Sequence, residues 1–349
     1  MRALVYADLQ ATDGHEHLYS NPTQSLQIWR VNQFYQSLLD IYKKFNCTAL
    51  WDLGDTTDDR TAIPVPAIDA LCANLAQFPW NDFNVKLVGN HEQYLRNTQV
   101  TVGQLFQPYF RVVSQPWSFM VNDHVQVVCA PYPADEIELA TWLEKERAES
   151  QGIKSILLGH FQISGCWGPS GQLLAGLTIE KLAWFKLGLL GHIHRPQQIG
   201  NCHYVGSPFQ QDWGEAGEEK RVGIVDISPE GEIDLQWVDI AGFPEYREVK
   251  LHEFNDLCTE GCEDRFRVVL KSPEEAAQFY AHKFSHRAEP QYDFDVSAAL
   301  AESRAEVASE SWTPERVMRH YLDKNPPSDR GIPISSEEML KFGMEVYSS

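Results

Sequence analysis

Five short apolar runs, each ending in polar residues, mark the first two thirds of the chain. An apolar run closed by a glycine or an acid is typical of a buried strand that stops at a tight turn. In open α/β sheets, ligands bind just beyond the carboxyl ends of such strands. The runs are Arg2–Asp8, Ala49–Asp55, Val85–Glu92, Lys154–His160 and Leu187–His194.

Segments with helical spacing alternate with these runs and predict a layered α/β domain. The expected helices are Ser25–Phe45, Pro66–Phe78, Thr98–Tyr109, Asp135–Ser150 and Thr178–Phe185, and further strands are expected at Arg111–Phe119 and His124–Ala130. Asn201–Pro208, Arg221–Ile227 and Glu232–Ile240 are expected to run antiparallel and to close a second sheet against the first. The prediction is therefore a two-sheet β-sandwich flanked by helices.

The pattern changes near Pro244. A polar helix at Phe254–Asp264, a strand at Arg265–Lys271 and a helix at Ser272–Phe284 are expected there, followed by short amphipathic helices at Thr313–Leu322 and Ser335–Tyr347. This predicts a core domain over residues 1–243, a small α+β cap over 244–300 and a helical docking segment for a partner over 301–349. A simple packing appendage is the alternative.

Composition sets limits on the function. The 349 residues carry 49 acidic and 29 basic side chains, a net charge of −20, which is unfavourable for a protein that binds nucleic acid over a broad surface. The seven cysteines are scattered, which favours the reducing cytoplasm. Since no apolar run is long enough to span a bilayer, we expect no membrane association.

The polar residues at the ends of the five runs are those that bind metal ions. Carboxylate and amide oxygens and imidazole nitrogens suit divalent cations. A single Gly-Asp or Gly-His is usually only a turn, but the ordered series Asp8, Gly-Asp55, Gly-Asn90-His91, Gly-His160 and Gly-His192-x-His194 is hard to obtain by chance.

The series resembles the motifs of the calcineurin-type metallophosphoesterases, which read Asp-x-His, Gly-Asp, Gly-Asn-His, His and Gly-His-x-His. The resemblance implies two divalent ions bridged by Asp55 and an activated hydroxide that attacks phosphorus. It implies that the first ion is held by Asp8, Gln10, Asp55 and His194, and the second by Asp55, Asn90, His160 and His192. His91 matches the family's acid, which protonates the leaving oxygen or stabilises the transition state.

Gln10 departs from the motif because the family has histidine there. Three outcomes are open: Gln10 binds the first ion weakly, binds it through water, or is replaced by His15 or His17 from the following loop. The expected result is a weaker first site that favours a hard ion such as Mn²⁺. Glu92 stands where relatives often carry aspartate, and is expected either to orient His91 or to be an ordinary surface acid.

Three further features resemble the SbcD-type DNA repair nucleases: the Asp55-Thr56-Thr57-Asp58 spacing, the Tyr204–Pro208 segment and the C-terminal cap with helices. That resemblance implies a manganese-dependent double-strand exonuclease and single-strand endonuclease, with Mg²⁺ as the second choice of ion. It also implies a homodimer with a coiled-coil ATPase partner of the SbcC kind.

Local features support DNA binding only in part. Arg60 and Arg195 flank the expected site and could hold phosphates, or pair with nearby acids. Trp167, Phe209 and Trp213 could stack on a frayed base, or serve as core or dimer contacts. Two alternatives are a small-substrate phosphodiesterase or phosphatase, which the acidic charge favours, and a structural subunit with a decayed site, which only Gln10 supports.

Overall fold

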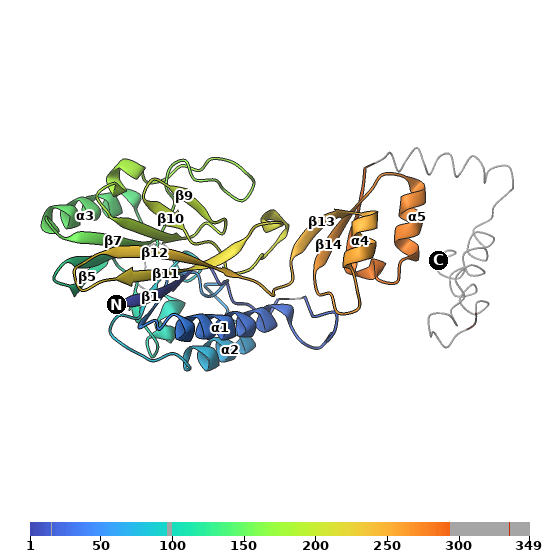
Figure 1. Ribbon diagram of the computed structural model, residues 1–349, viewed down its shortest axis with the longest axis horizontal. Helices are drawn as coiled ribbons and strands as arrows, with labels where there is room; N and C mark the ends of the chain where they lie inside the picture. Colours follow the sequence, from blue (N-terminus) through green and yellow to red (C-terminus); the bar gives the residue numbers. More distant parts are fainter. Residues whose placement is uncertain (15, 96–99, 294–334, 336–349) are drawn as a thin grey trace. The chain divides into compact units, whose positions relative to one another are not determined.

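The computed structural model describes residues 1–14, 16–95, 100–293 and 335 (Figure 1). Contacts divide these residues into two compact units, one formed by Met1–Arg267 with His286–Glu289 and the other by Val268–Ser285 with the described residues from Pro290 onward. The predicted helices at Thr313–Leu322 and Ser335–Tyr347 lie outside the described residues, apart from Ser335 itself. The domain boundaries at residues 243 and 300 remain predictions.

Two mixed six-stranded sheets form the core of the first unit, as predicted. The first sheet has the order β12-β11-β1-β2-β3-β4 and the second β5-β6-β7-β8-β10-β9. The strands of the first are β1 (Arg2–Tyr6), β2 (Ala49–Asp52), β3 (Val85–Leu87), β4 (Arg111–Val113), β11 (Lys220–Ile227) and β12 (Ile233–Ile240). Those of the second are β5 (Trp117–Asn122), β6 (Val125–Ala130), β7 (Lys154–His160), β8 (Leu187–Gly191), β9 (Gln197–Ile199) and β10 (Cys202–Tyr204).

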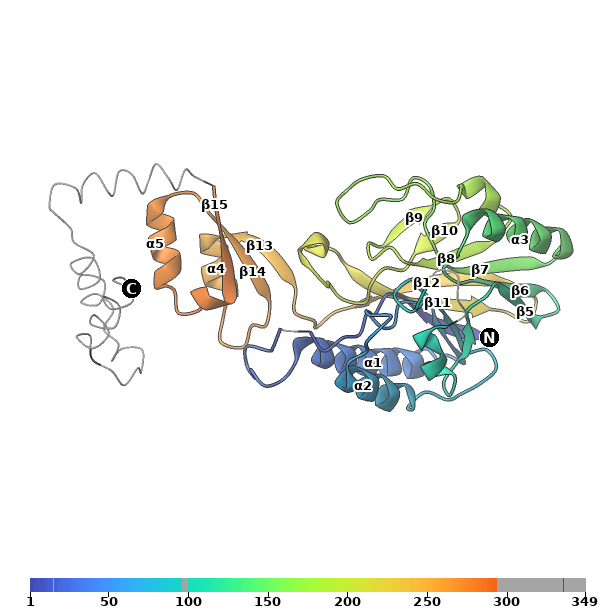
Figure 2. The same ribbon diagram turned by 180° about the vertical axis from the view of Figure 1, so that it is seen from behind.

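Helices cover the outer faces of both sheets. Figures 1 and 2 show α1 (Leu26–Lys44) and α2 (Val65–Leu75) beside one another on one side of the stacked sheets, and α3 (Glu136–Glu149) on the other. Short 3₁₀ helices lie in the connections: η1 (Val102–Phe106), η2 (Ile179–Leu182) and η3 (Trp213–Glu215). No helix in the described part of the chain is both long and apolar enough to cross a membrane.

The alternation of side chains along each strand builds three cores. In β1, Leu4 and Tyr6 pack with Phe34 and Leu38 of α1, whereas the intervening Val5 faces the second sheet. Full burial of a Phe34 or Leu38 side chain contributes about 1.5–3 kcal/mol. On the outer face of the second sheet, Val128 and Leu157 pack against Leu139 and Leu143 of α3. The period of two thus gives a four-layer arrangement with an apolar core between the sheets.

Local signals explain where the helices begin. The Ser25 side chain caps α1 by accepting a hydrogen bond from the Ile28 N–H at 3.3 Å, and a proline lies in the first turn of α2. The Asp135 carboxylate caps α3. The helices expected at Thr98–Tyr109 and Thr178–Phe185 contain only the short η1 and η2 in their described residues.

The strand expected at Arg111–Phe119 is wrong. It is two strands, because β4 ends at Val113 in the first sheet and β5 begins at Trp117 in the second. Pro116 lies between them, and a proline cannot donate a ladder hydrogen bond. The chain therefore changes sheets at this point.

The expected run of antiparallel strands is correct for one pair only. β11 and β12 are antiparallel, but they extend the first sheet, where Val225 of β11 pairs with Ala3 of β1. β10 joins the second sheet and runs parallel to β8. The three segments therefore join two different sheets and do not form one antiparallel run.

The C-terminal segment has the α+β character that was predicted. A three-stranded sheet of order β13-β14-β15 is formed by β13 (Tyr246–Lys250), β14 (Arg265–Leu270) and β15 (Ala288–Tyr292). Its helices are α4 (Leu251–Leu257), α5 (Pro273–Ala281) and the short η4 (Ser285–Arg287). α4 begins three residues before the expected Phe254 and ends well before Asp264.

Candidate metal centre

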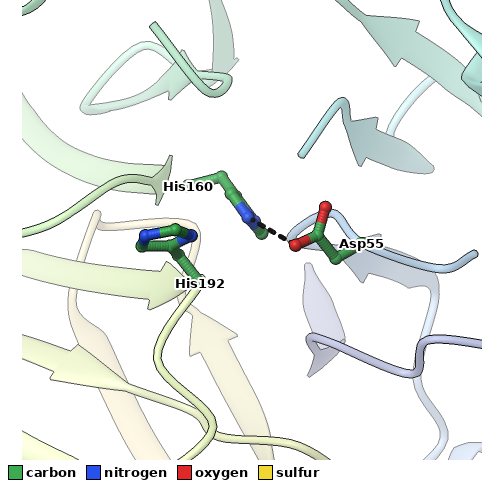
Figure 3. Close-up of side chains that lie close together, drawn as sticks. All are labelled: Asp55, His160 and His192. Carbon is green, nitrogen blue, oxygen red and sulfur yellow. Dashed lines mark hydrogen bonds and ion pairs between the residues drawn. The ribbon is translucent and has the colours of Figure 1, made fainter. Parts of the chain in front are cut away.

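Both sheets deliver their polar residues to one site. Asp8, Asp55 and the pair Asn90-His91 follow β1, β2 and β3 of the first sheet, which run parallel. His160 ends β7, and His192 and His194 follow β8 of the second sheet, which is parallel to β7. Figure 3 shows Asp55 facing His160 and His192, whose ligand atoms all lie within 4.8 Å of one another.

The set predicted for the second ion is closely assembled. His160 Nε2 lies 3.1 Å from Asp55 Oδ2 and 3.2 Å from Asn90 Oδ1, and His192 Nδ1 lies 2.7 Å from the same Asn90 oxygen. His160 Nδ1 lies 2.7 Å from the Leu53 carbonyl, to which it donates, so the ring is oriented with Nε2 toward the two oxygens. A carboxylate oxygen, an amide oxygen and imidazole nitrogens that converge in this way fit a divalent ion.

The pKa values of these residues also indicate a place for positive charge beside Asp55. Burial lowers the pKa of His160, but the Asp55 carboxylate outweighs burial and raises it to about 9. Burial likewise raises the pKa of Asp55, yet His160 holds it at about 2. A proton on the imidazole balances the carboxylate charge at neutral pH, in the position that a metal ion would take. His192 stays neutral because burial, followed by the charge on His160, lowers its pKa to about 3.

The set predicted for the first ion is centred on Asp8 and His194. The buried Asp8 carboxylate accepts the His192 backbone N–H at 2.8 Å, and burial raises its pKa to about 6. Gln10 Nε2 lies 3.0 Å from His194 Nε2. Rotation of the Gln10 amide would present its oxygen instead, so direct ligation stays a prediction. Of the two alternative donors, His15 lies outside the described residues, and His17 lines a separate cavity with Tyr19.

Backbone strain is concentrated at these candidate ligands. Among the described residues, five that are not glycine have a positive φ angle, and four of the five are Asp8, Gln10, Asp55 and His192. Such conformations cost about 1–3 kcal/mol each and persist where the surrounding structure holds them. The φ angle of +104° at Gly54 favours glycine for a second reason, because a Cβ atom there would lie 2.6 Å from His160 Nδ1.

His91 lies beside the ligands and faces outward. Its backbone N–H donates to Asp55 Oδ1 at 2.9 Å, and its Nδ1 lies 2.6 Å from the Asp58 carbonyl oxygen and 3.4 Å from Asp58 Oδ1. The hydrogen bond with Asp58 raises the pKa of His91 to about 9. A half-buried imidazolium that is held in this way can donate a proton to a leaving oxygen.

Both interpretations offered for Glu92 are wrong. Glu92 is fully buried, so it is no surface acid, and its carboxylate accepts hydrogen bonds from the Gly89 and Thr56 N–H groups at 3.1 and 3.0 Å. It also pairs with Lys86 at 2.7 Å, and Lys86 reaches Asp52 at 3.2 Å. Glu92 thus holds together the two turns that carry Asn90 and Asp55.

The residues predicted to contact phosphates or bases differ in their exposure. Arg60 and Arg195 are exposed, and Arg195 is 3.7 Å from Glu218. Phe209 is buried at 2% exposure in the α1 core, which removes it as a stacking platform. Trp213 packs edge-on against Tyr246, whereas Trp167 is 48% exposed.

Two supporting residues were not predicted. Glu215 Oε1 lies 2.7 Å from His194 Nδ1, and Gln162 Nε2 lies 3.1 Å from His192 Nε2. Gln162 follows the His160 motif by two residues, which is a weak signal. Glu215 has no sequence signal, since it lies in the short η3 after β10 and reaches His194 only through the fold.

No protein-family model and no curated protein matches the chain. Solved structures that do match include the calcineurin-like phosphoesterase YfkN from Bacillus subtilis, at 14% identity and a TM-score of 0.38, over 69% of this chain and 91% of that one. A dimetal phosphatase from Danio rerio matches at 11% identity and a TM-score of 0.42, over 69% and 99%. An archaeal phosphodiesterase matches at 10% identity and a TM-score of 0.34, over 68% and 100%. The chemistry available to the present chain follows from its own residues.

Proposed function

We propose that this chain is a two-metal phosphodiesterase. The observation that supports the proposal most strongly is the convergence of Asp55, Asn90 and His160, in which the two side-chain oxygens lie 3.1 and 3.2 Å from His160 Nε2. Asp8 and His194, the first and last members of the motif series, extend the set. Asp8, Gln10, Asp55 and His194 would hold one ion, and Asp55, Asn90, His160 and His192 the other, with Mn²⁺ the expected metal and Mg²⁺ the second choice.

The side chains have separate tasks in this chemistry. When bound, the two ions would neutralise charge on the phosphate and lower the pKa of a water molecule. The Leu53 carbonyl and Glu215 orient the two imidazoles by accepting their Nδ1 protons. His91 protonates the leaving oxygen, which becomes a hydroxyl group as one P–O bond breaks and one water is consumed.

For the substrate we propose DNA, hydrolysed as by the SbcD-type nucleases. The exposed Trp167 offers a surface for base stacking, and its backbone exchanges hydrogen bonds of 2.8 and 3.0 Å with Gln197, whose amide also reaches the Arg195 carbonyl. An indole and a guanidinium are thereby carried by two linked segments, one of which directly follows His194. A homodimer, a cap over residues 244–300, an SbcC-like ATPase docked on residues 301–349 and a cytoplasmic location belong to the same proposal.

The second candidate is a phosphodiesterase or phosphatase for small substrates. The net charge of −20 favours it, because a long polyanion is repelled by an acidic surface. A nuclease could still act if its contacts are local or if a partner presents the DNA.

The test is manganese-dependent degradation of an end-labelled linear duplex, with His91→Ala as the control. Degradation that is lost in the variant supports the nuclease. Hydrolysis of bis-nitrophenyl phosphate without degradation of DNA, also after addition of an SbcC-like ATPase, supports the small-substrate enzyme instead. No manganese-dependent hydrolysis of either substrate would contradict the two-metal phosphodiesterase itself.

A further inference from the structure

A cavity of about 460 Å³ lies directly beside the candidate metal centre. This volume is within the range of small-molecule sites. His192 and Gln162 form the wall next to the metal ligands, and the remaining wall includes Tyr132, Asp135, Glu136 and Ile137. The cavity is therefore continuous with the site where a phosphodiester would bind.

Tyr132 forms a fixed aromatic side of the cavity, next to the candidate ligands. Its ring centroid lies 5.5 Å from that of His192 and 6.3 Å from that of His160. Its backbone is held on both sides, because the Tyr132 N–H donates to the Val88 carbonyl at 2.9 Å and its carbonyl accepts from Gln93 Nε2 at 2.9 Å. A planar group next to a bound phosphate would meet this ring.

The charges around the cavity disfavour a second phosphate. The start of α3 would normally attract an anion through its free N–H groups. Here the Asp135 carboxylate already accepts the Ile137 and Glu138 N–H groups at 2.7 and 3.1 Å, and Glu136 adds a second negative charge. No lysine or arginine is among the described residues that line the cavity.

Apolar surface supplies the remaining contact. Ile137 is 77% exposed although it is a large aliphatic residue, and it lines the cavity together with Pro133. An uncharged ring would cover Ile137 and remove apolar area from water, at about 25 cal/mol per Å². The cavity thus has an aromatic side chain, an exposed aliphatic side chain and negative charge that repels anions.

We propose that this cavity binds the uncharged terminal nucleoside on one side of the scissile phosphate and excludes a substrate that carries a further phosphate there. The inference rests on the proposed phosphodiesterase function and deepens it. The enzyme then accepts a nucleic-acid end with a free hydroxyl on that side and rejects the same end when it is phosphorylated. Glu136 is the residue that sets this selectivity.

The test uses the full chain with Mn²⁺ and three dithymidine substrates: one without a terminal phosphate, one with a 5′-phosphate and one with a 3′-phosphate. One of the two phosphorylated forms should be cleaved with a kcat/KM about tenfold lower than the unphosphorylated form, since like charges are placed together. Glu136→Lys should bring that ratio back toward one. Glu138→Lys is the matched control, because it makes the same charge change in the same helical turn, outside the cavity lining.

Ratios measured within one preparation are independent of the folded fraction. Equal cleavage of all three substrates, or an equal effect of the two lysine variants, would overturn the inference. Hydrolysis of bis-nitrophenyl phosphate without cleavage of any dithymidine would overturn the nucleoside site and leave the phosphodiesterase intact. Loss of all hydrolysis would overturn the proposed function itself.

Discussion

The carboxylate of Glu215 lies 2.7 Å from Nδ1 of His194 and fixes the direction in which that imidazole points. The ring must donate from Nδ1, which leaves the Nε2 lone pair free to bind a metal ion. Burial raises the pKa of Glu215, but His194 and Lys220 outweigh it and hold the pKa at about 2, so the group stays ionised.

Glu215→Gln should therefore weaken the first ion site. Loss of such an outer contact typically lowers metal affinity by about 10–100-fold. The second site should keep its affinity, because its histidine is oriented by Leu53 instead. Calorimetric titration with Mn²⁺ separates the two sites. Glu218→Gln is the control, since Glu218 also pairs with Lys220, at 3.0 Å, and should leave both affinities unchanged.

The contact between Asp58 and His91 predicts a pH dependence. His91 acts as an acid only while protonated, and the Asp58 hydrogen bond raises its pKa to about 9. Asp58→Asn removes the negative charge and lowers this pKa. The alkaline limb of the rate profile should then move to lower pH, by about one unit.

The measurement is kcat for bis-nitrophenyl phosphate between neutral and alkaline pH. Asp59→Asn is the matched control, because the Asp59 carboxylate accepts the Thr61 N–H at 2.6 Å, which ties it to its own turn. If the alkaline limb moved equally in both variants, or in neither, His91 would not be the acid that protonates the leaving oxygen.

The meeting of the candidate ligands could be predicted from sequence because they lie at or just beyond the ends of apolar runs. The end of a parallel strand has a fixed place in a sheet, so position in the chain predicts position in the site. Glu215 could not be predicted, because it reaches His194 from the short η3, 21 residues further along the chain. The roles of such residues depend on packing between distant segments.

The same limit explains the errors in the fold. Arg111–Phe119 was expected to be one strand, although Ser114, Gln115 and Pro116 interrupt its apolar residues; the local pattern does not reveal that the chain changes sheets there. Glu92 was expected to be at the surface or beside His91, because a local sequence does not reveal that Lys86 points into the same buried space. Buried charges are paired by tertiary structure rather than by spacing.

Gln10→His should strengthen the first ion site. In the structure the Gln10 amide nitrogen lies 3.0 Å from His194 Nε2, the atom expected to bind the ion. An imidazole supplies a more basic ligand atom at this position. We therefore expect a gain in Mn²⁺ affinity of about tenfold, similar to the effect of a group that hydrogen-bonds to a metal ligand. Gln10→Ala measures how much the amide itself contributes. Unchanged affinity at both sites in Gln10→His would contradict the weak-site hypothesis.

Lys86→Met should destabilise the protein strongly at neutral pH. Lys86 is fully buried between Asp52 and Glu92, and removing one partner from a buried ionic group typically costs about 3–5 kcal/mol. Burial already raises the pKa of Glu92, and loss of the Lys86 charge raises it further. A carboxyl group whose pKa is raised in the folded state stabilises that state only when protonated.

The free energy of unfolding of Lys86→Met should therefore recover as the pH falls from 8 to about 5, and urea denaturation at several pH values measures it. Lys145→Met is the control, because Lys145 forms an exposed helical pair with Glu149, at 3.7 Å, and should change stability little at any pH. A deficit in Lys86→Met that does not depend on pH would mean that lost packing, and not charge, is the cause.

A single methyl group added at Gly89 should disrupt the whole metal centre. A Cβ atom at Gly89 would lie 2.6 Å from the Asp55 backbone nitrogen and would collide with the Asp55 carboxylate. Because Asp55 is expected to bridge both ions, Gly89→Ala should abolish Mn²⁺ binding at both sites together. Gly261→Ala is the control, since nothing lies within 4 Å of a Cβ atom there. Retention of either site in Gly89→Ala, measured by calorimetry on protein whose folding is verified by circular dichroism, would show that Asp55 does not bridge the ions.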